Sequence, residues 1–209
     1  MSIPEDSKET GRVEAFSDGV FAIAMTLLVL ELHVPKTEDI TRVGGLAVAI
    51  LQMWPSFVSF VLGFGFVLVG WINHHRLFNH IRKVDGTFLL LNGMLLMVFT
   101  LVPYPISILA AHINGPNSKT AIIFYSAFSL LVAVGFQVVW RYASYNGRLL
   151  RKNMNLEQIN AITRQYNIVF PIFVAGFLLS FVAPYVGLAI MAGLILYFAA
   201  RGFTTVRSE

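Results

Sequence analysis

The sequence predicts an all-α integral membrane protein with six transmembrane helices per chain. Hydrophobic residues make up 56% of the 209 residues. The mean hydropathy of +0.71 is far above that of a soluble domain. The apolar residues gather in stretches of about twenty, which is long enough for a helix to cross a hydrocarbon core of roughly 30 Å. Lys and Arg fall between these stretches or close to their ends.

The six expected spans are bounded by charged residues, by Pro or Gly, or by polar clusters. They cover residues 10–33, 50–74, 87–110, 119–143, 164–183 and 185–203. The last two share a hinge at Ala183-Pro184-Tyr185 with almost no loop. We treat residues 1–209 as a single transmembrane domain, because the sequence shows no tandem repeat. Four prolines in or near spans are expected to kink them, namely Pro55, Pro103, Pro105 and Pro171.

The basic residues predict the orientation of the chain. Three of them, Lys36, Arg42 and Lys119, lie on one side of the spans, and the other twelve lie on the opposite side. Positive charge concentrates on the cytoplasmic side, so we expect both termini to be cytoplasmic. The twelve are Lys8, Arg12, Arg76, Arg82, Lys83, Arg141, Arg148, Arg151, Lys152, Arg164, Arg201 and Arg207. Since they act as topology signals, no nucleic acid partner is expected, and the basic segment 144–163 is interpreted as a solvated linker or surface helix.

The first span carries ionisable residues into the membrane. Between Asp18 and Glu31 lie twelve uncharged residues, which make only about 18 Å of helix. The span must therefore bury Asp18, and Glu14 with it, below the membrane surface. An ionisable group there persists only with a partner or a wet cavity, so it marks a candidate functional site.

A stripe of branched side chains runs along the same span. Five branched residues recur at three- and four-residue steps and therefore share one helix face. They are Val20, Ile23, Leu27, Leu30 and Val34, and Thr26 lies beside them. Such a stripe is typical of packing within a bundle. It also fits a pore wall, in which symmetry copies of these residues form apolar constrictions. Periodicity alone leaves both interpretations open.

The partner of Asp18 must come from another helix, because its neighbour Glu14 carries a like charge. Trp71 and His75 share a face of the second span, with His74 beside them, and Asn92 lies at matching depth in the third span. We therefore expect a supporting hydrogen-bond network that consists of Ser17, Asp18, Trp71, Asn92 and either His74 or His75. The rival hypothesis is a proton relay or ion-binding site, since an imidazole beside a carboxylate can titrate near neutral pH.

Three histidines within residues 73–80 raise the possibility of a metal enzyme. Clustered histidines ligate metals, but a catalytic centre of that kind needs several clusters, and the chain has only five histidines. We therefore expect neither an enzyme nor a cofactor. The chain has no cysteine, which excludes disulfides. Its first ten residues lack the pattern of a secretory signal, so the first span is expected to remain in the mature protein.

The string Arg12-x-x-x-Phe16-Ser17-Asp18, followed by Gly-Val-Phe-Ala-Ile-Ala, resembles the signature of the transmembrane protein 175 family. That family comprises endolysosomal potassium channels and their bacterial homologues, and the chain resembles a prokaryotic member with a single six-helix repeat. The resemblance implies a homotetramer in which the first helix lines a central pore. It also implies that Ile23, Leu27 and Leu30 form the narrow region, with the Thr26 hydroxyl close by.

The function expected from this resemblance is a potassium-selective, leak-like cation channel in the bacterial inner membrane. Potassium would pass Ile23 and Thr26 in transit without a fixed metal site, and apolar rings could gate the pore by expelling water. The chain lacks the T-V-G-Y-G string of carbonyl-lined filters. Expected partners are further copies of the chain and membrane lipid. A secondary ion- or proton-coupled transporter and a non-conducting membrane scaffold are the alternatives.

Overall fold

The computed structural model describes the backbone of residues 5–205 and the side chains of residues 9–200. Within these residues the chain is helical apart from its connections and one isolated bridge between Ile81 and Leu150. The elements are α1 (Glu5–Leu27), the 3₁₀ helix η1 (Leu28–Glu31), α2 (Thr37–Val43), α3 (Leu46–Gln52), α4 (Trp54–His80), α5 (Gly86–Thr100), α6 (Pro103–His112), α7 (Ser118–Ser144), the 3₁₀ helix η2 (Tyr145–Gly147), α8 (Leu156–Leu179) and α9 (Pro184–Thr205).

Among the described residues, five stretches are long and apolar enough to cross a membrane. They are Glu9–Glu31, Trp54–His80, Gly86–His112, Ser118–Gly147 and Leu156–Leu179. In α9 the apolar part within the described residues, Pro184–Ala200, is shorter. The sixth span therefore stays a prediction. Three residues used to predict the orientation, Lys8, Arg201 and Arg207, have side chains outside the described residues.

Pro55 and Pro103 lie in the first turns of α4 and α6, whereas Pro171 lies inside α8, which continues through it as one helix. Pro55 lies in the first turn of α4, where its missing N–H costs nothing. The span expected at residues 87–110 is divided into α5 and α6 immediately before Pro103. Pro103 has no N–H to offer the Phe99 carbonyl, which accepts instead from Val102 N at 3.2 Å in a tighter turn.

The fifth span begins earlier than expected, at Leu156 instead of residue 164. A capping box starts it: Asn155 Oδ1 accepts from Gln158 N at 2.8 Å, and Gln158 Oε1 accepts from Asn155 N at 3.1 Å. The first span also differs, because its α-helix ends at Leu27 and continues only as η1. Val34, expected on the helical stripe, lies beyond it.

The segment expected as a solvated linker at residues 144–163 is tied to the bundle in its first half. Arg82 N donates to Leu149 O at 2.8 Å, and Arg151 N donates to His80 O at 3.0 Å. Leu149 and Leu150 are almost fully buried. A free linker is therefore the wrong interpretation for the first half, whereas residues 156–163 form the largely exposed start of α8 and agree with the alternative of a surface helix. These main-chain hydrogen bonds join the α7–α8 connection to the end of α4.

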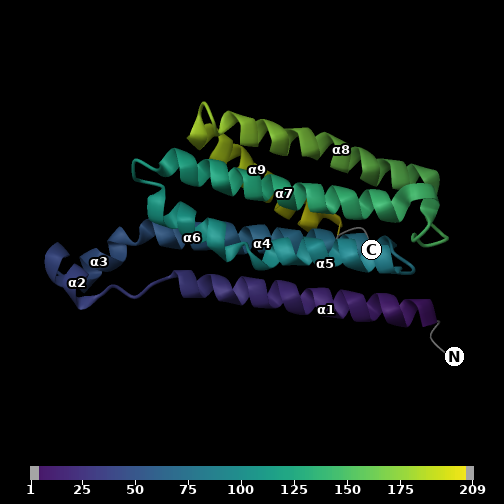
Figure 1. Cartoon of the computed structure of the whole chain (residues 1–209), viewed down its shortest axis with the longest axis horizontal. Coiled ribbons are helices and arrows are strands. Elements are labelled where there is room, and N and C mark those ends of the chain that lie inside the picture. Colours follow the sequence, from purple (N-terminus) through teal and green to yellow (C-terminus); the bar gives the residue numbers. More distant parts are fainter. Residues whose placement is uncertain (1–4, 206–209) are drawn as a thin grey trace.

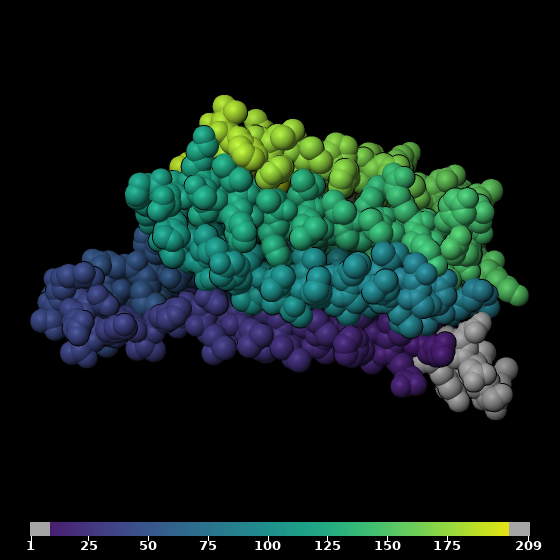
Figure 2. Space-filling view, in the orientation of Figure 1, coloured from purple at the N-terminus to yellow at the C-terminus, as the bar shows by residue number. Residues whose placement is uncertain are grey.

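The bundle packs in layers, with α1 along one edge (Figure 1). α1 contacts α4 and α5, while α7, α8 and α9 pack together on the other side of α4. Phe99 lies at the centre of the core, 4.6 Å from the Phe21 ring and 6.0 Å from the Phe136 ring between centroids. Figure 2 shows α1 along the edge of the surface, with α2 and α3 extending beyond the bundle. One face of α1 is thus covered by the chain and the other is bare.

Candidate functional site

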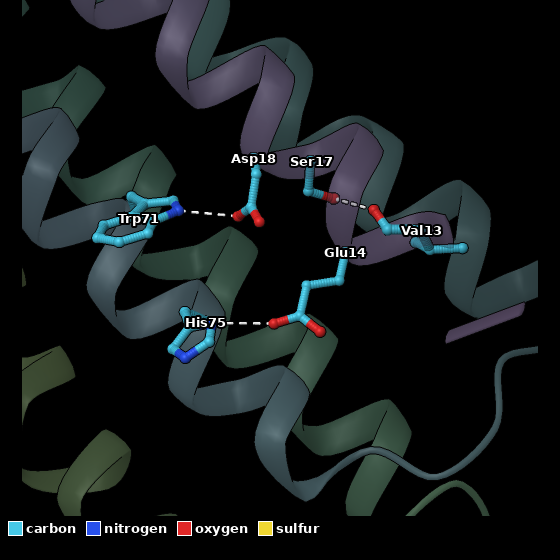
Figure 3. Close-up of polar contacts among 6 residues, drawn as sticks. All are labelled: Val13, Glu14, Ser17, Asp18, Trp71 and His75. Atoms are coloured by element: carbon cyan, nitrogen blue, oxygen red, sulfur yellow. Dashed lines mark hydrogen bonds and ion pairs between the residues drawn. The ribbon is translucent and has the colours of Figure 1, made fainter. Parts of the chain in front are cut away.

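Two acidic residues of α1 face two hydrogen-bonding residues of α4 (Figure 3). Trp71 Nε1 donates to Asp18 Oδ1 at 2.8 Å. One turn away, His75 Nδ1 lies 2.9 Å from Glu14 Oε1. Each pair of residues is spaced i, i+4, so both lie on one face of their helix. Because α1 and α4 run antiparallel, the earlier residue of one helix meets the later residue of the other.

A second set of hydrogen bonds joins α1 to α5 and then to α4. Asn92 Nδ2 donates to Ser17 Oγ at 3.1 Å, and Ser17 Oγ donates to Val13 O at 2.8 Å. Asn92 Oδ1 lies 2.8 Å from His74 Nε2. Since an amide oxygen only accepts, His74 carries its proton on Nε2. The three side chains that make these hydrogen bonds are all buried, namely those of Ser17, Asn92 and His74.

His74 is enclosed in a way that favours the neutral ring. Its Nδ1 is buried without a hydrogen-bond partner. The Phe78 ring stacks on the imidazole at 4.5 Å between centroids, and the Phe21 ring lies at 5.2 Å. A second proton on the imidazole would place an N–H in apolar surroundings, which is costly. The arrangement is therefore suited to holding α1, α4 and α5 together.

The structure thus brings the expected residues into contact, but in separate groups. Asp18 contacts Trp71, whereas His74 and Asn92 belong to the buried set with Ser17. His75, expected near Asp18, is bonded to Glu14 instead. Glu14 was not expected among the supporting residues. The signal for it was its position one turn before Asp18, matched by the same spacing of Trp71 and His75 on α4.

Three residues of the apolar stripe lie on the bare face of α1, whereas Val20 is half-buried against the core. Ile23, Leu27 and Leu30 are 59%, 41% and 68% exposed, whereas Phe21 and Leu28, on the opposite face, are fully buried. Thr26 is exposed beside the stripe, and its hydroxyl donates to Ile23 O at 2.9 Å. That bond leaves the lone pairs of the hydroxyl oxygen available to a ligand. Bundle packing within one chain does not account for the stripe.

The remaining motif residues also face outward. Phe16 is 67% exposed, and Arg12 is exposed one turn before it. In the stretch from Arg12 to Asp18, Ser17 and Asp18 point inward to α5 and α4, while Arg12 and Phe16 remain available to another molecule. Leu30 lies in η1, where the tighter winding rotates it relative to an α-helix.

Comparison with known proteins identifies relatives along almost the whole chain. The profile of the family described as "Endosomal/lysosomal potassium channel TMEM175" matches residues 12–103. A protein of Chamaesiphon minutus named a potassium channel is 41% identical over 201 residues, which cover 96% of this chain and 98% of that one. A Streptomyces collinus protein, also named a potassium channel, is 36% identical and covers 95% of this chain and 94% of its own length.

A solved structure has the same fold. The crystal structure of a lysosomal potassium-selective channel TMEM175 homologue from Chamaesiphon minutus superposes with a TM-score of 0.85 at 38% identity. The match covers 93% of this chain and 98% of that chain. The mouse endosomal/lysosomal proton channel TMEM175 is 35% identical over 66% of this chain, which corresponds to 28% of the mouse protein. Together with its five apolar helices, this makes the chain an integral, multi-pass membrane protein.

Proposed function

This chain belongs to the TMEM175 family, and on that premise we propose that it is a potassium channel. The single observation that carries the proposal is the bare apolar face of α1, present in a chain whose relatives at 41% and 36% identity are named potassium channels. A face of three exposed branched residues in the second half of the span needs either lipid or further protein beside it. A pore built from several copies of α1 gives the face a function.

The pore would be formed by four chains around a central axis. One helix per chain cannot enclose an axis, so a channel lined by α1 requires a closed cyclic oligomer. The resemblance to bacterial family members supports four copies. Ile23, Leu27 and Leu30 would then form successive rings at one-turn intervals. Rings of this kind close a pore by expelling water, so small changes in radius would gate it.

The ion would meet few polar groups on this path. Thr26 contributes a hydroxyl oxygen between the rings of Ile23 and Leu27, and helix carbonyls near η1 are further transient ligands. Potassium would be bound in transit near Ile23 and Thr26 rather than at a fixed site. No T-V-G-Y-G filter contributes, because the chain has no such string.

The hydrogen bonds of Asp18, Ser17, Trp71, His74, His75 and Asn92 would hold the pore helix in place. They fix the rotation of α1 about its axis, and this rotation decides which residues face outward. This scaffold role is favoured over a proton relay by the enclosure of His74, whose second ring nitrogen faces apolar side chains. We place the chain in a bacterial inner membrane with both termini on the cytoplasmic side and with α9 as the sixth span.

A secondary transporter has less support. Such proteins bind substrate where helices are broken near the membrane centre. The break between α5 and α6 falls at Leu101 and Val102, whose side chains are apolar and whose carbonyls already accept from Tyr104 N and Ile106 N. A non-conducting scaffold would give no ion flux, which distinguishes it from a channel. Proton flux belongs in the same measurement, since the mouse relative is named a proton channel.

The test is ion flux through purified protein in liposomes under opposed potassium and sodium gradients. We expect passive flux that favours potassium, with Ile23→Asn changing its rate or selectivity and Leu27→Ala widening the pore. Ile168→Asn on α8 is a matched control, because Ile168 is 58% exposed against 59% for Ile23. Absence of flux in assembled protein, or equal effects of the two asparagine variants, would refute a pore on α1.

A further inference from the structure

A large cavity lies beside α4, and residues of α5, α7, α8 and α9 complete its lining. Its volume is about 950 Å³. Protein interiors rarely leave voids larger than a water molecule, and sites of about 300–1,000 Å³ are typical of bound small molecules. The cavity is therefore large enough to hold a hydrocarbon chain or a small molecule.

Most of the cavity lining is apolar. Phe66 of α4, Val132 of α7, Phe173 of α8 and Met191 and Leu194 of α9 line it. The lining extends along α4 from Phe66 to His80, which is about 21 Å of helix at 1.5 Å per residue. Half of a hydrocarbon core is about 15 Å thick. The shape thus matches a hydrocarbon chain that lies along the helices within one leaflet.

The end of the cavity near the α7–α8 connection is polar and cationic. Arg76 and Arg151 line it there, and among the described lining residues none is an Asp or a Glu. A second cavity of about 360 Å³ adjoins it and shares Asn79, His80 and Arg151. Asn153 and Gln158 add amide groups to this smaller cavity. An anionic group, with polar substituents beyond it, fits this end.

We propose that the two cavities bind one anionic phospholipid of the cytoplasmic leaflet. An acyl chain fills the apolar cavity, the phosphate lies between Arg76 and Arg151, and the headgroup enters the smaller cavity. The predicted orientation places this end at the cytoplasmic surface, where anionic headgroups attract arginines. A phospholipid is favoured over a free fatty acid, because a carboxylate alone would leave the amide-lined cavity unfilled. The proposal does not depend on conduction by the pore.

The tryptophans make the site directly observable. The chain has three, and two of them, Trp71 and Trp140, line the cavity. Trp54→Phe removes the third, which is exposed at the other end of α4. In liposomes of phosphatidylcholine, increasing fractions of phosphatidylglycerol with dibrominated chains would quench the remaining fluorescence by contact. We expect half-maximal quenching at a fraction about 25-fold lower than with dibrominated phosphatidylcholine, because each of the two arginines near anionic lipid contributes about fivefold.

Variants assign the effect to the site. Arg151→Gln and Arg76→Gln should each raise the half-maximal fraction of the anionic lipid about fivefold. Arg164→Gln is the matched control, an exposed arginine of α8 outside the lining, and should change nothing. Ala133→Leu should reduce maximal quenching by filling the cavity from α7. Arg151 lies in a connection, so its variant keeps the test valid if Arg76→Gln fails to fold.

Two results would overturn the proposal. Equal half-maximal fractions for the anionic and zwitterionic lipids would show that the cationic end selects no headgroup. Stronger quenching by dibromostearic acid than by the phosphatidylglycerol would assign the cavity to a fatty acid instead.

Discussion

At the scale of single residues, Asp18 is a carboxylate within a membrane span that has an indole N–H as its partner. The bond from Trp71 Nε1 is 2.8 Å long, and hydrogen bonds to a charged acceptor stabilise by roughly 1.5–3 kcal/mol. A partner on another helix could be expected from sequence, because the charge of Glu14 excludes a local one. The sequence could not predict that His75 bonds to an acid while His74 bonds to Asn92, since the two histidines are adjacent and differ only in their rotation about the helix.

We predict that Trp71→Phe lowers the free energy of unfolding by about 1.5–3 kcal/mol, because it removes the donor and leaves Asp18 exposed to apolar surroundings. For a chain of this size the melting temperature in detergent should fall by roughly 3–12 °C. Asp18→Asn should cost less, since the amide oxygen still accepts from the indole. Trp54→Phe, at an exposed tryptophan, is the control. Equal melting temperatures for the Trp71 and Trp54 variants would contradict the prediction.

At the scale of elements, the positions of helices were more predictable than their ends. Hydropathy identified the apolar cores of α1, α4, α7 and α8 because composition alone determines them. The start of α8 was missed although Asn155 and Gln158 show the spacing of a capping box, since the charges around them suggested a solvated segment. The helices α2 and α3 were missed as well. Each has seven residues, which is too short for a clear periodic pattern.

The packing of α4 on α5 depends on a glycine. A Cβ on Gly70 would overlap the ring of Phe99, which is fully buried between other aromatic rings. Gly70→Ala should therefore cost about 1–3 kcal/mol by forcing that ring to move. Gly93→Ala in α5 is the matched control, because nothing lies within 4 Å of its added Cβ. Chemical or thermal unfolding in detergent measures both. A Gly70 variant as stable as the Gly93 variant would show that the core accommodates the methyl group.

At the scale of the whole molecule, the structure shows which helix surfaces are covered by other helices, which the periodicity of the sequence could not. The stripe of Ile23, Leu27 and Leu30 fitted both packing and a pore wall, and the fold shows that no other part of the described chain covers it. The cavity beside α4 was likewise unpredictable, because its lining comes from five helices and the α7–α8 connection. Both surfaces arise only when helices distant in sequence are placed side by side.

The assembly can be tested without background, because the chain has no cysteine. If several copies of α1 surround a narrow pore, the cysteines introduced by Ile23→Cys lie close to one another. They should then form disulfide-linked dimers when membranes are oxidised. A disulfide needs Cβ atoms about 3.5–4.5 Å apart, so only a face turned toward other copies qualifies. Ile168→Cys, equally exposed on α8, should stay monomeric on a non-reducing gel. The same purified protein should have the mass of four chains. Efficient cross-linking at Ile168 with none at Ile23 would place α8 at the subunit interface and α1 against lipid.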